Sequence, residues 1–227
     1  MNFTFGICTI NESGADTRIN QIINSIEQIK LNNYEIIIIG GKGDNYSNKK
    51  NVKRIEFDET IKKNWITRKK NIIAEVANYE NIVMMHDYFL FPVDWAESFK
   101  KIENDFQTCD VCCCPIIMAN GKRQYIDWTT YDHPLYGHQA SLNYNDWTNT
   151  KHQYISGAFF IVKKKFMLEN KLDEKLGWYV PNEKGQNEDV EWSLRIREKA
   201  KIICNPFTYV QHNKIHRDIN VLPRIIK

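Results

Sequence analysis

The sequence has no long hydrophobic run. Its longest purely aliphatic run is Ile36–Ile39, far short of the roughly 20 apolar residues that a membrane-spanning helix needs. The N-terminal segment has no basic residue before Arg18, and polar residues interrupt its apolar stretch, so it lacks the pattern of a secretory signal. We therefore expect no transmembrane segment and a cytoplasmic location, either free or peripheral at a membrane surface.

The sequence also has no marked excess of one charge. Its 31 Lys and Arg residues nearly balance 28 Asp and Glu residues, which leaves a formal net charge of +3, and the basic clusters are interleaved with acids. A nucleic-acid-binding face would concentrate positive charge, so we expect no nucleic-acid partner. We interpret each basic cluster as a solvated face, with an anion or membrane-surface patch as the alternative.

The chain needs no disulfide or structural metal to hold a core, because a domain of 227 residues buries about 70% of its unfolded surface. Cys109, Cys112, Cys113 and Cys114 superficially suggest a zinc site. They run consecutively along a β-rich stretch rather than lying in two pairs on turns, so we predict that the cysteines pack in the core, with a redox role as the alternative. The chain has neither an internal repeat nor a low-complexity linker, and we predict one domain over residues 1–227.

Predicted strands alternate with predicted helices along the chain, which indicates an α/β fold with a mostly parallel sheet flanked by helices. Residues 119–154 are rich in aromatic, His and Asn residues without a sustained period, and we interpret them as a long functional loop or insertion. The predicted strands are 3–10, 34–39, 51–57, 82–85, 110–117, 155–162, 202–204 and 208–210, and the predicted helices are 16–30, 66–78, 95–104, 164–170 and 187–201.

Polar residues follow several of these strands, and ligands of such sheets bind beyond the carboxyl ends of the strands. The segments expected at that edge are 9–12, 40–44, Asp58 and 86–88. His86, Asp87 and His212 lie at strand ends, where a carboxylate and an imidazole would suit Mn²⁺ or a similar divalent ion, although a single His is more often an ordinary packed or surface residue.

Three acids gather at the start of a predicted helix, in Asn187-Glu188-Asp189-x-Glu191. Acids at a helix N-terminus complement the helix dipole and stabilise the helix by about 0.3–1 kcal/mol each, which alone would explain them. A carboxylate in this position is also a suitable general base if it faces a cleft. The residues alone leave both interpretations open.

Taken in chain order, several segments resemble the family 2-type glycosyltransferases of the GT-A fold. Residues 68–77, RKKNIIAEVA, resemble the family's ARNxGxxxA helix, and IVMMHDY at 82–88 with PVDW at 92–95 resembles its strand ending in Asp-x-Asp. SGAFFIVK at 156–163 resembles its GGFF strand, and the segments 172–174, 187–197 and 205–212 resemble its closing block. Two positions depart from the family: His86-Asp87-Tyr88 replaces Asp-x-Asp, and Gly40–Asp44 replaces an acid-rich turn.

The resemblance implies a GT-A-type, Rossmann-like sandwich with a mixed, mostly parallel central sheet, in which about residues 1–95 bind the nucleotide and about 96–227 bind the acceptor and carry catalysis. It implies a hexosyltransferase-like enzyme that moves a sugar from a nucleoside diphosphate sugar, with UDP as the expected nucleotide, to a hydroxyl of a glycan, a lipid-linked sugar or a protein. A Mn²⁺ or Mg²⁺ ion is the implied cofactor.

The resemblance also implies roles for individual residues. Asp189 would be the general base of an inverting displacement, with Glu188 beside it, and Asp87 and His212 would hold the metal. The implied donor-binding residues are Thr9, Asn11, Glu12, Asp44, Asp58, Arg68, Asn71, His86, Asp87 and Gly157, and the implied acceptor-binding residues are Trp128, Tyr131 and Trp178.

Two other functions are weighed against this one. A catalytically silent, glycosyltransferase-like module that binds sugar or protein would also explain the altered Asp-x-Asp segment. A sugar nucleotidyltransferase is disfavoured, because the chain lacks the glycine-rich, basic N-terminal loop that such enzymes use against a triphosphate.

Overall fold

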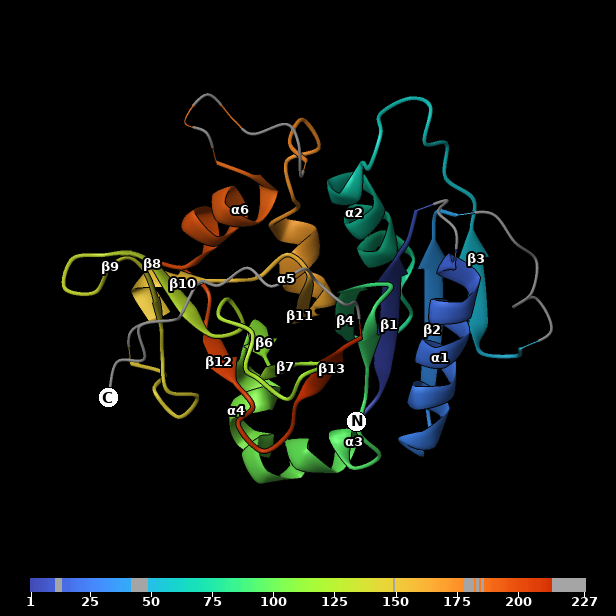
Figure 1. Ribbon diagram of the computed structural model, residues 1–227, viewed down its shortest axis with the longest axis horizontal. Coiled ribbons are helices and arrows are strands. Elements are labelled where there is room, and N and C mark those ends of the chain that lie inside the picture. The colour runs from blue at the N-terminus through green and yellow to red at the C-terminus, as the bar shows by residue number, and fades with distance from the viewer. Residues whose placement is uncertain are drawn as a thin grey trace.

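A seven-stranded sheet forms the centre of the computed structural model, which describes residues 1–10, 14–41, 49–148, 150–177, 182, 184 and 186–213 (Figure 1). The strand β11 is antiparallel to both of its neighbours, whereas the other pairings of this sheet are parallel, so the expected mixed, mostly parallel α/β sheet is confirmed. The spatial order is β12 (Ile202–Cys204), β6 (Val111–Cys113), β11 (Phe159–Lys163), β4 (Asn81–His86), β1 (Phe3–Cys8), β2 (Tyr34–Ile39) and β3 (Val52–Ile55).

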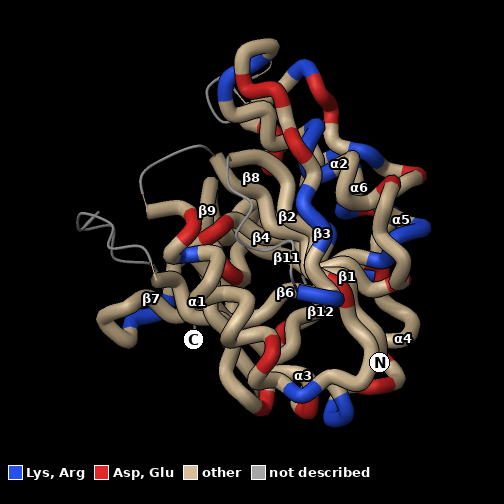
Figure 2. The backbone as a smooth tube through the Cα atoms, turned by 90° about the vertical axis from the view of Figure 1, so that its right-hand side faces the viewer, with Lys and Arg blue, Asp and Glu red and all other residues tan. Residues whose placement is uncertain are grey.

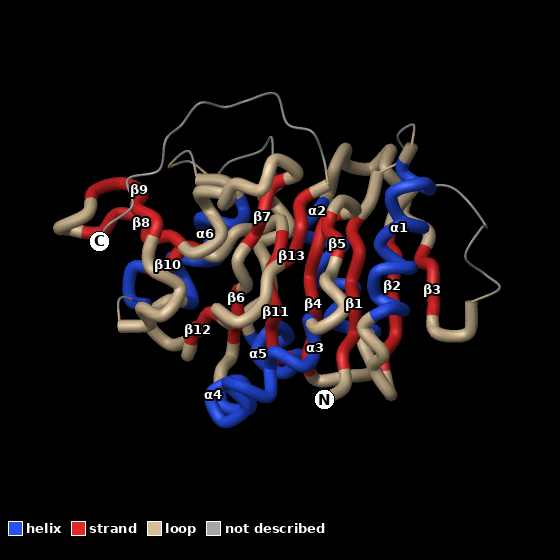
Figure 3. Tube along the Cα trace, turned by 60° about the horizontal axis from the view of Figure 1, so that its bottom comes forward, coloured by secondary structure: helices blue, strands red, loops and turns tan. Residues whose placement is uncertain are grey.

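Helices cover both faces of this sheet, and Figure 3 shows its strands side by side between them. Because successive side chains of a strand point to opposite faces, Ile36 and Ile38 of β2 pack in one buried cluster, while Ile37 and Ile39 pack in the other. The first cluster lies under α1 (Ala15–Gln28), α3 (Trp95–Ser98), the 3₁₀ turn Phe99–Ile102 and α4 (Glu103–Thr108), and the second under α2 (Ile66–Val76), α5 (Lys164–Glu169) and α6 (Glu188–Ile196).

The predicted loop 119–154 is wrong for much of its length. It contains β8 (Thr129–His133) and β9 (Gly137–Ser141), which form a three-stranded antiparallel sheet with β10 (Gln153–Tyr154), preceded by a 3₁₀ turn at Thr150–His152. This small sheet lies beyond the β12 side of the main sheet, next to α6 (Figure 1). Its strands are short and mostly polar, so no hydrophobic period marked them.

The predicted strand 110–117 is divided into β6 and β7 (Ile116–Met118). Pro115 lies between them, and a proline cannot donate a backbone hydrogen bond to a sheet. The strand β7 instead joins a second small sheet with β13 (Val210–His212) and β5 (Phe89–Leu90), and this sheet brings residues 210–212 beside the end of β4.

The six cysteines are unpaired and buried, which confirms core packing. Burial raises the pKa of the Cys8 thiol to about 11. Lys and Arg positions are interspersed with Asp and Glu positions along the tube (Figure 2). Within the described residues, no helix is both long enough and apolar enough to span a bilayer.

Candidate active site

The carboxyl ends of β1 and β4 meet the segment that leads into β11. Cys8 and His86 are register partners on the two parallel strands, and the backbone N–H of His86 donates to the carbonyl of Ala158 at 3.0 Å. Thr9, Asp87 and Gly157 therefore lie at one edge of the sheet, as expected for this strand order.

Asp87 joins β1, β4 and α1 at this edge. Its Oδ2 accepts hydrogen bonds from Thr9 Oγ1 at 2.8 Å and from Arg18 Nη2 at 2.8 Å, and its backbone carbonyl accepts from Arg18 Nε at 3.3 Å. The side chain of Asp87 is 9% exposed and that of Arg18 is 20% exposed. The acid that the sequence placed at a metal site is thus the partner of a guanidinium.

Two consecutive lysines of α2 reach the same edge from the face of the sheet that α2 covers. Lys69 Nζ donates to the carbonyl of Thr9 at 2.7 Å and pairs with Glu59, and Lys70 Nζ donates to the carbonyl of Gly157 at 2.6 Å. Both lysines are buried. A buried ammonium group is tolerated only where such acceptors and charges compensate it. Through these contacts α2 places two positive charges beside the strand ends.

The first turn of α6 brings Asp189 to Gly157. Asp189 Oδ2 accepts from Tyr154 Oη at 2.5 Å and from the Gly157 N–H at 3.2 Å, while Oδ1 accepts from the Val190 N–H at 2.8 Å. A Cβ added at Gly157 would lie 3.0 Å from Asp189 Cβ and 3.3 Å from Lys70 Nζ. Glycine at this position therefore lets the acid and the lysine approach the backbone.

Glu188 lies beside Asp189 but is buried, with 2% of its surface exposed. Burial raises the pKa of its carboxyl, the nearby Lys70 charge opposes that rise, and the Asp189 charge adds to it. Its Oε2 atom is buried and has no hydrogen-bond partner in the described part of the chain. The two acids of the predicted motif thus occupy different environments, one partly exposed and one enclosed.

Arg68 and Asn71 were expected to bind the donor, but their contacts hold another segment. Arg68 Nη1 pairs with Glu174 at 3.0 Å, and the side-chain amide of Asn71 exchanges hydrogen bonds of 3.0 Å with both backbone groups of Leu172. These contacts direct both side chains to residues 172–174, and their donor-binding role stays a prediction. Asp58 is fully exposed, and its Oδ1 accepts from the backbone and hydroxyl of Thr60, which is a turn contact.

The described residues show no assembled metal site. Asp87 is engaged by Thr9 and Arg18, and the buried His212 ring packs on Tyr88 at 4.4 Å between ring centroids. His86 Nδ1 lies 2.8 Å from the same tyrosine's hydroxyl. No three His, Cys, Asp or Glu side chains of the described residues gather to hold an ion. Asp87 and His212 make these contacts within the protein, and their metal ligation stays a prediction.

The residues expected to bind the acceptor differ in their exposure. Trp128 is fully buried in the core and donates its indole N–H to the carbonyl of Asp146, so its ring faces are not available to a sugar. Tyr131 is partly exposed on β8, beside His138 and near Tyr154. Four expected site residues lie outside the described residues: Asn11, Glu12, Asp44 and Trp178.

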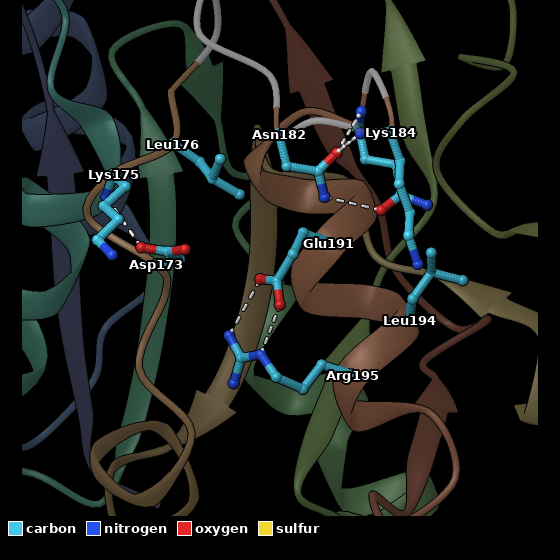
Figure 4. A pocket seen from close by; sticks show the side chains of 9 residues that line it. Asp173, Lys175, Leu176, Asn182, Lys184, Glu191, Leu194 and Arg195 are labelled. Carbon is cyan, nitrogen blue, oxygen red and sulfur yellow. Dashed lines mark hydrogen bonds and ion pairs between the residues drawn. The ribbon is translucent and has the colours of Figure 1, made fainter.

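A groove of about 700 Å³ lies on the other side of α6 (Figure 4). Glu191 and Arg195 pair across one helical turn at 2.7 Å on its wall and face the turn that contains Asp173 and Lys175 (Figure 4). The groove is lined mainly by charged and polar side chains, and it does not include Asp189. We do not assign it to the site at the strand ends.

Sequence reasoning missed three residues at this edge: Arg18, Lys70 and Tyr154. Lys70 carried a detectable signal, because it falls at helical spacing with Ile66 and Ile73 on the apolar face of α2, where a charged residue is unusual. Arg18 and Tyr154 carried none, since each reaches its acid from a distant part of the chain.

Comparison with known proteins places this fold. No family model matches the sequence, and no curated protein matches it. Solved structures match at TM-scores of 0.55 to 0.61: S. aureus TarS 1–349 with UDP-GlcNAc (13% identity, 95% of this chain and 60% of that chain), GalNAc-T7 with UDP, GalNAc and Mn²⁺ (15%, 92% and 43%) and the mannosyltransferase PcManGT from Pyrobaculum calidifontis with GDP-Man and Mn²⁺ (11%, 95% and 57%).

These structures are GT-A glycosyltransferases, and the chain has their fold. It spans less than two thirds of the length of each of those chains. At such low sequence identity the likeness concerns the fold, and the function has to be argued from the site itself.

Proposed function

We propose that the protein is a hexosyltransferase-like glycosyltransferase that transfers a sugar from a nucleoside diphosphate sugar, with UDP as the nucleotide, to an acceptor hydroxyl. The observation that carries this proposal is the position of Asp189, whose carboxylate lies against Gly157 at the carboxyl edge of a GT-A-type sheet. Binding of UDP-GlcNAc or GDP-Man by structures of the same fold supports the class of donor.

The proposed reaction is a single displacement. The acceptor oxygen bonds to the anomeric carbon as the bond from that carbon to the diphosphate oxygen breaks. The electron pair leaves with the nucleoside diphosphate, and the acceptor proton passes to Asp189 as general base. One displacement inverts the anomeric configuration. No step of this proposal is routed through a metal.

Arg18 is suited to stabilise the departing diphosphate. Its guanidinium is already at the Thr9–Asp87 edge and partly exposed, and a fixed positive group acts most strongly where negative charge develops. Glu188 is proposed to contact the donor sugar or the acceptor hydroxyl through its buried carboxyl. Thr9, Asp87 and Gly157 stay proposed parts of the donor edge, and Tyr131 of the acceptor side, which would receive a glycan, a lipid-linked sugar or a protein.

The test is a thermal-shift screen with UDP-GlcNAc and GDP-mannose, each with EDTA and with Mn²⁺. A ligand that binds only the native state raises the melting temperature. We expect stabilisation by UDP-GlcNAc in EDTA, and we expect Asp189→Asn to keep that stabilisation while losing at least about 100-fold in sugar transfer or donor hydrolysis. Glu191→Gln, on the outer side of the same helix, is the matched control and should keep its rate. Full activity in Asp189→Asn would remove Asp189 from the mechanism.

The second candidate is a catalytically silent sugar- or protein-binding module of the same fold. The observation that favours it is the engagement of Asp87 by Arg18 in place of an Asp-x-Asp metal site. Donor binding with no turnover in the wild type, or no donor binding in either EDTA or Mn²⁺, would support this candidate over the enzyme.

A further inference from the structure

A tyrosine from the small sheet holds the proposed base. Tyr154 is 5% exposed, and its hydroxyl donates to Asp189 Oδ2 at 2.5 Å. Burial, and next the negative charge of Asp189, raise the pKa of Tyr154 well above its ordinary value, so the phenol stays protonated and remains a donor. Hydrogen bonds to an ionised group are shorter and stronger than those between neutral groups.

The hydrogen bonds on Asp189 differ between its two oxygens. Among the described residues, Oδ2 accepts from both Tyr154 Oη and the Gly157 N–H, whereas Oδ1 accepts from the Val190 N–H alone. A carboxylate oxygen has two lone-pair sites. The two donors fill both sites of Oδ2, and one site of Oδ1 is left for a proton.

The backbone around the base is fixed to the same segment. The Ile155 N–H donates to Ser193 Oγ at 2.8 Å, and that hydroxyl donates to the carbonyl of Asp189 at 2.6 Å. At the other end of α6, Arg197 Nη1 donates to the carbonyl of Tyr131 on β8 at 3.1 Å. The first turn of α6 is therefore bound to Tyr154 of β10 through Asp189, the segment just after β10 is bound to Ser193, and the C-terminal end of α6 is bound to β8.

We infer that Tyr154 is a positioning residue for the proposed general base: it locks the Asp189 carboxylate so that Oδ1 accepts the acceptor's proton. Tyr154 acts through Asp189. The ring of Tyr154 lies 6.5 Å, between centroids, from that of Tyr131, so the residue that holds the base is also near a residue proposed for the acceptor side. This inference rests on the proposed function.

The variant that tests it is Tyr154→Phe, which removes one hydroxyl and keeps the ring. Tyr144→Phe is the matched control, because Tyr144 Oη donates to Asp127 Oδ2 at 2.6 Å, the same kind of bond at a carboxylate away from the site. We expect kcat for nucleotide-sugar hydrolysis, followed as UDP release from UDP-GlcNAc, to fall about tenfold in Tyr154→Phe, with KM for the donor changed less than twofold.

The pH profile separates positioning from a purely structural role. The hydrogen bond from the Tyr154 hydroxyl stabilises the ionised form of the Asp189 carboxylate. Because Tyr154→Phe removes that bond, the acid limb of the kcat profile should move to higher pH by about one unit. In Tyr144→Phe the limb should not move. If the wild type turns over the donor but the acid limb of the kcat profile does not move in Tyr154→Phe, the inference about Tyr154 is wrong and the proposed function is unaffected.

A double-mutant cycle on the ligand-free protein tests the contact without any donor. Unfolding in urea of Tyr154→Phe, Asp189→Asn and the double variant should show a coupling of about tenfold in the unfolding equilibrium constant. Coupling below twofold overturns the inference. If the wild type binds UDP-GlcNAc but shows no turnover, both the proposed enzymatic function and the inference about Tyr154 are wrong.

Discussion

At the scale of single residues, the site is built from groups that are costly to bury. Glu188, Lys69 and Lys70 are nearly inaccessible to solvent, and each is held near the strand ends by the fold around it. Residues selected for catalysis or binding often reduce stability, because their charges would be better solvated in the unfolded chain. Glu188 gives the clearest test of whether such a buried charge reduces stability.

Replacing Glu188 with Gln should stabilise the protein at neutral pH. Because burial raises the pKa of Glu188, the native state binds its proton more tightly than the unfolded state does, and this contribution to stability falls as pH rises above the unfolded carboxyl's range. The Gln side chain cannot ionise. We expect Glu188→Gln to exceed the wild type by about 1 kcal/mol in free energy of unfolding at pH 7, and the gain to vanish near pH 4.

Urea denaturation from pH 4 to pH 7 measures this difference, with the exposed Glu198→Gln as the control that should show almost none. A Glu188→Gln variant less stable than the wild type at pH 7 would contradict the burial argument. Donor turnover in the same variant should fall, since the residue is proposed to contact the substrates.

Sequence reasoning placed Asp87 at the ligand edge because it follows a predicted strand, whereas Asp189 and Gly157 were assigned to the site by the family resemblance. It could not place Arg18, because the guanidinium of an amphipathic helix is ordinarily solvated and nothing local indicates a partner at position 87. It assigned Trp128 to the acceptor because indole rings stack on sugars, but the same ring gains more by complete burial.

At the scale of elements, α2 supports two different parts of the molecule. Its lysines serve the strand ends, while Arg68 and Asn71 hold the segment 172–174 that precedes α6. The helix was predicted from its apolar period, and the identity of its polar contacts was not, since helical spacing gives the face of a side chain and not its partner.

Removing the Asn71 amide should loosen that segment. Asn71→Ala deletes two contacts to Leu172 and one to Glu174, each 3.0 Å long, and leaves buried backbone groups of Leu172 unpaired. We expect a loss of about 2–3 kcal/mol in free energy of unfolding, together with faster amide exchange over residues 172–177.

Asn104→Ala, at an exposed position of α4, is the matched control and should change stability by less than about 0.5 kcal/mol. Equal stability of the two variants would show that the Asn71 contacts contribute little. Unchanged amide exchange over 172–177 in Asn71→Ala would place its effect elsewhere.

The small sheet β8–β9–β10 is the element that sequence reasoning failed to find. Its strands alternate poorly and carry exposed polar residues such as His138 and Gln139, so neither a two-residue nor a helical period is present. The segment was interpreted as functional from its composition, and Tyr154, which contacts the proposed base, lies in its last strand.

At the scale of the whole molecule, the reactivity of the buried cysteines measures how often the folded protein unfolds. Six thiols are enclosed, and burial raises the pKa of Cys8 to about 11, so the reactive thiolate is scarce at pH 8. We expect no fast reaction of the native protein with a disulfide reagent such as DTNB at pH 8, and six equivalents after unfolding in guanidinium chloride.

The rate of native labelling should follow the rate of opening, and should rise when urea is added below the unfolding midpoint. Two or more thiols that react within seconds in the native protein would contradict the buried arrangement. Iodoacetamide labelling followed by peptide mass analysis would identify which cysteine reacts first.

The fold as a whole was predictable because alternating strands and helices allow few arrangements. The family resemblance implied a mixed sheet without saying which strand is antiparallel, and that strand is β11. That strand has a further consequence. Lying between β4 and β6, it joins the four strands from before residue 95 to the two other strands from after it within one sheet. The two parts of the sheet therefore depend on each other: severing the chain near residue 95 would deprive β4 of one hydrogen-bonding neighbour, and would take from the Lys70 ammonium the Gly157 carbonyl that accepts its hydrogen bond.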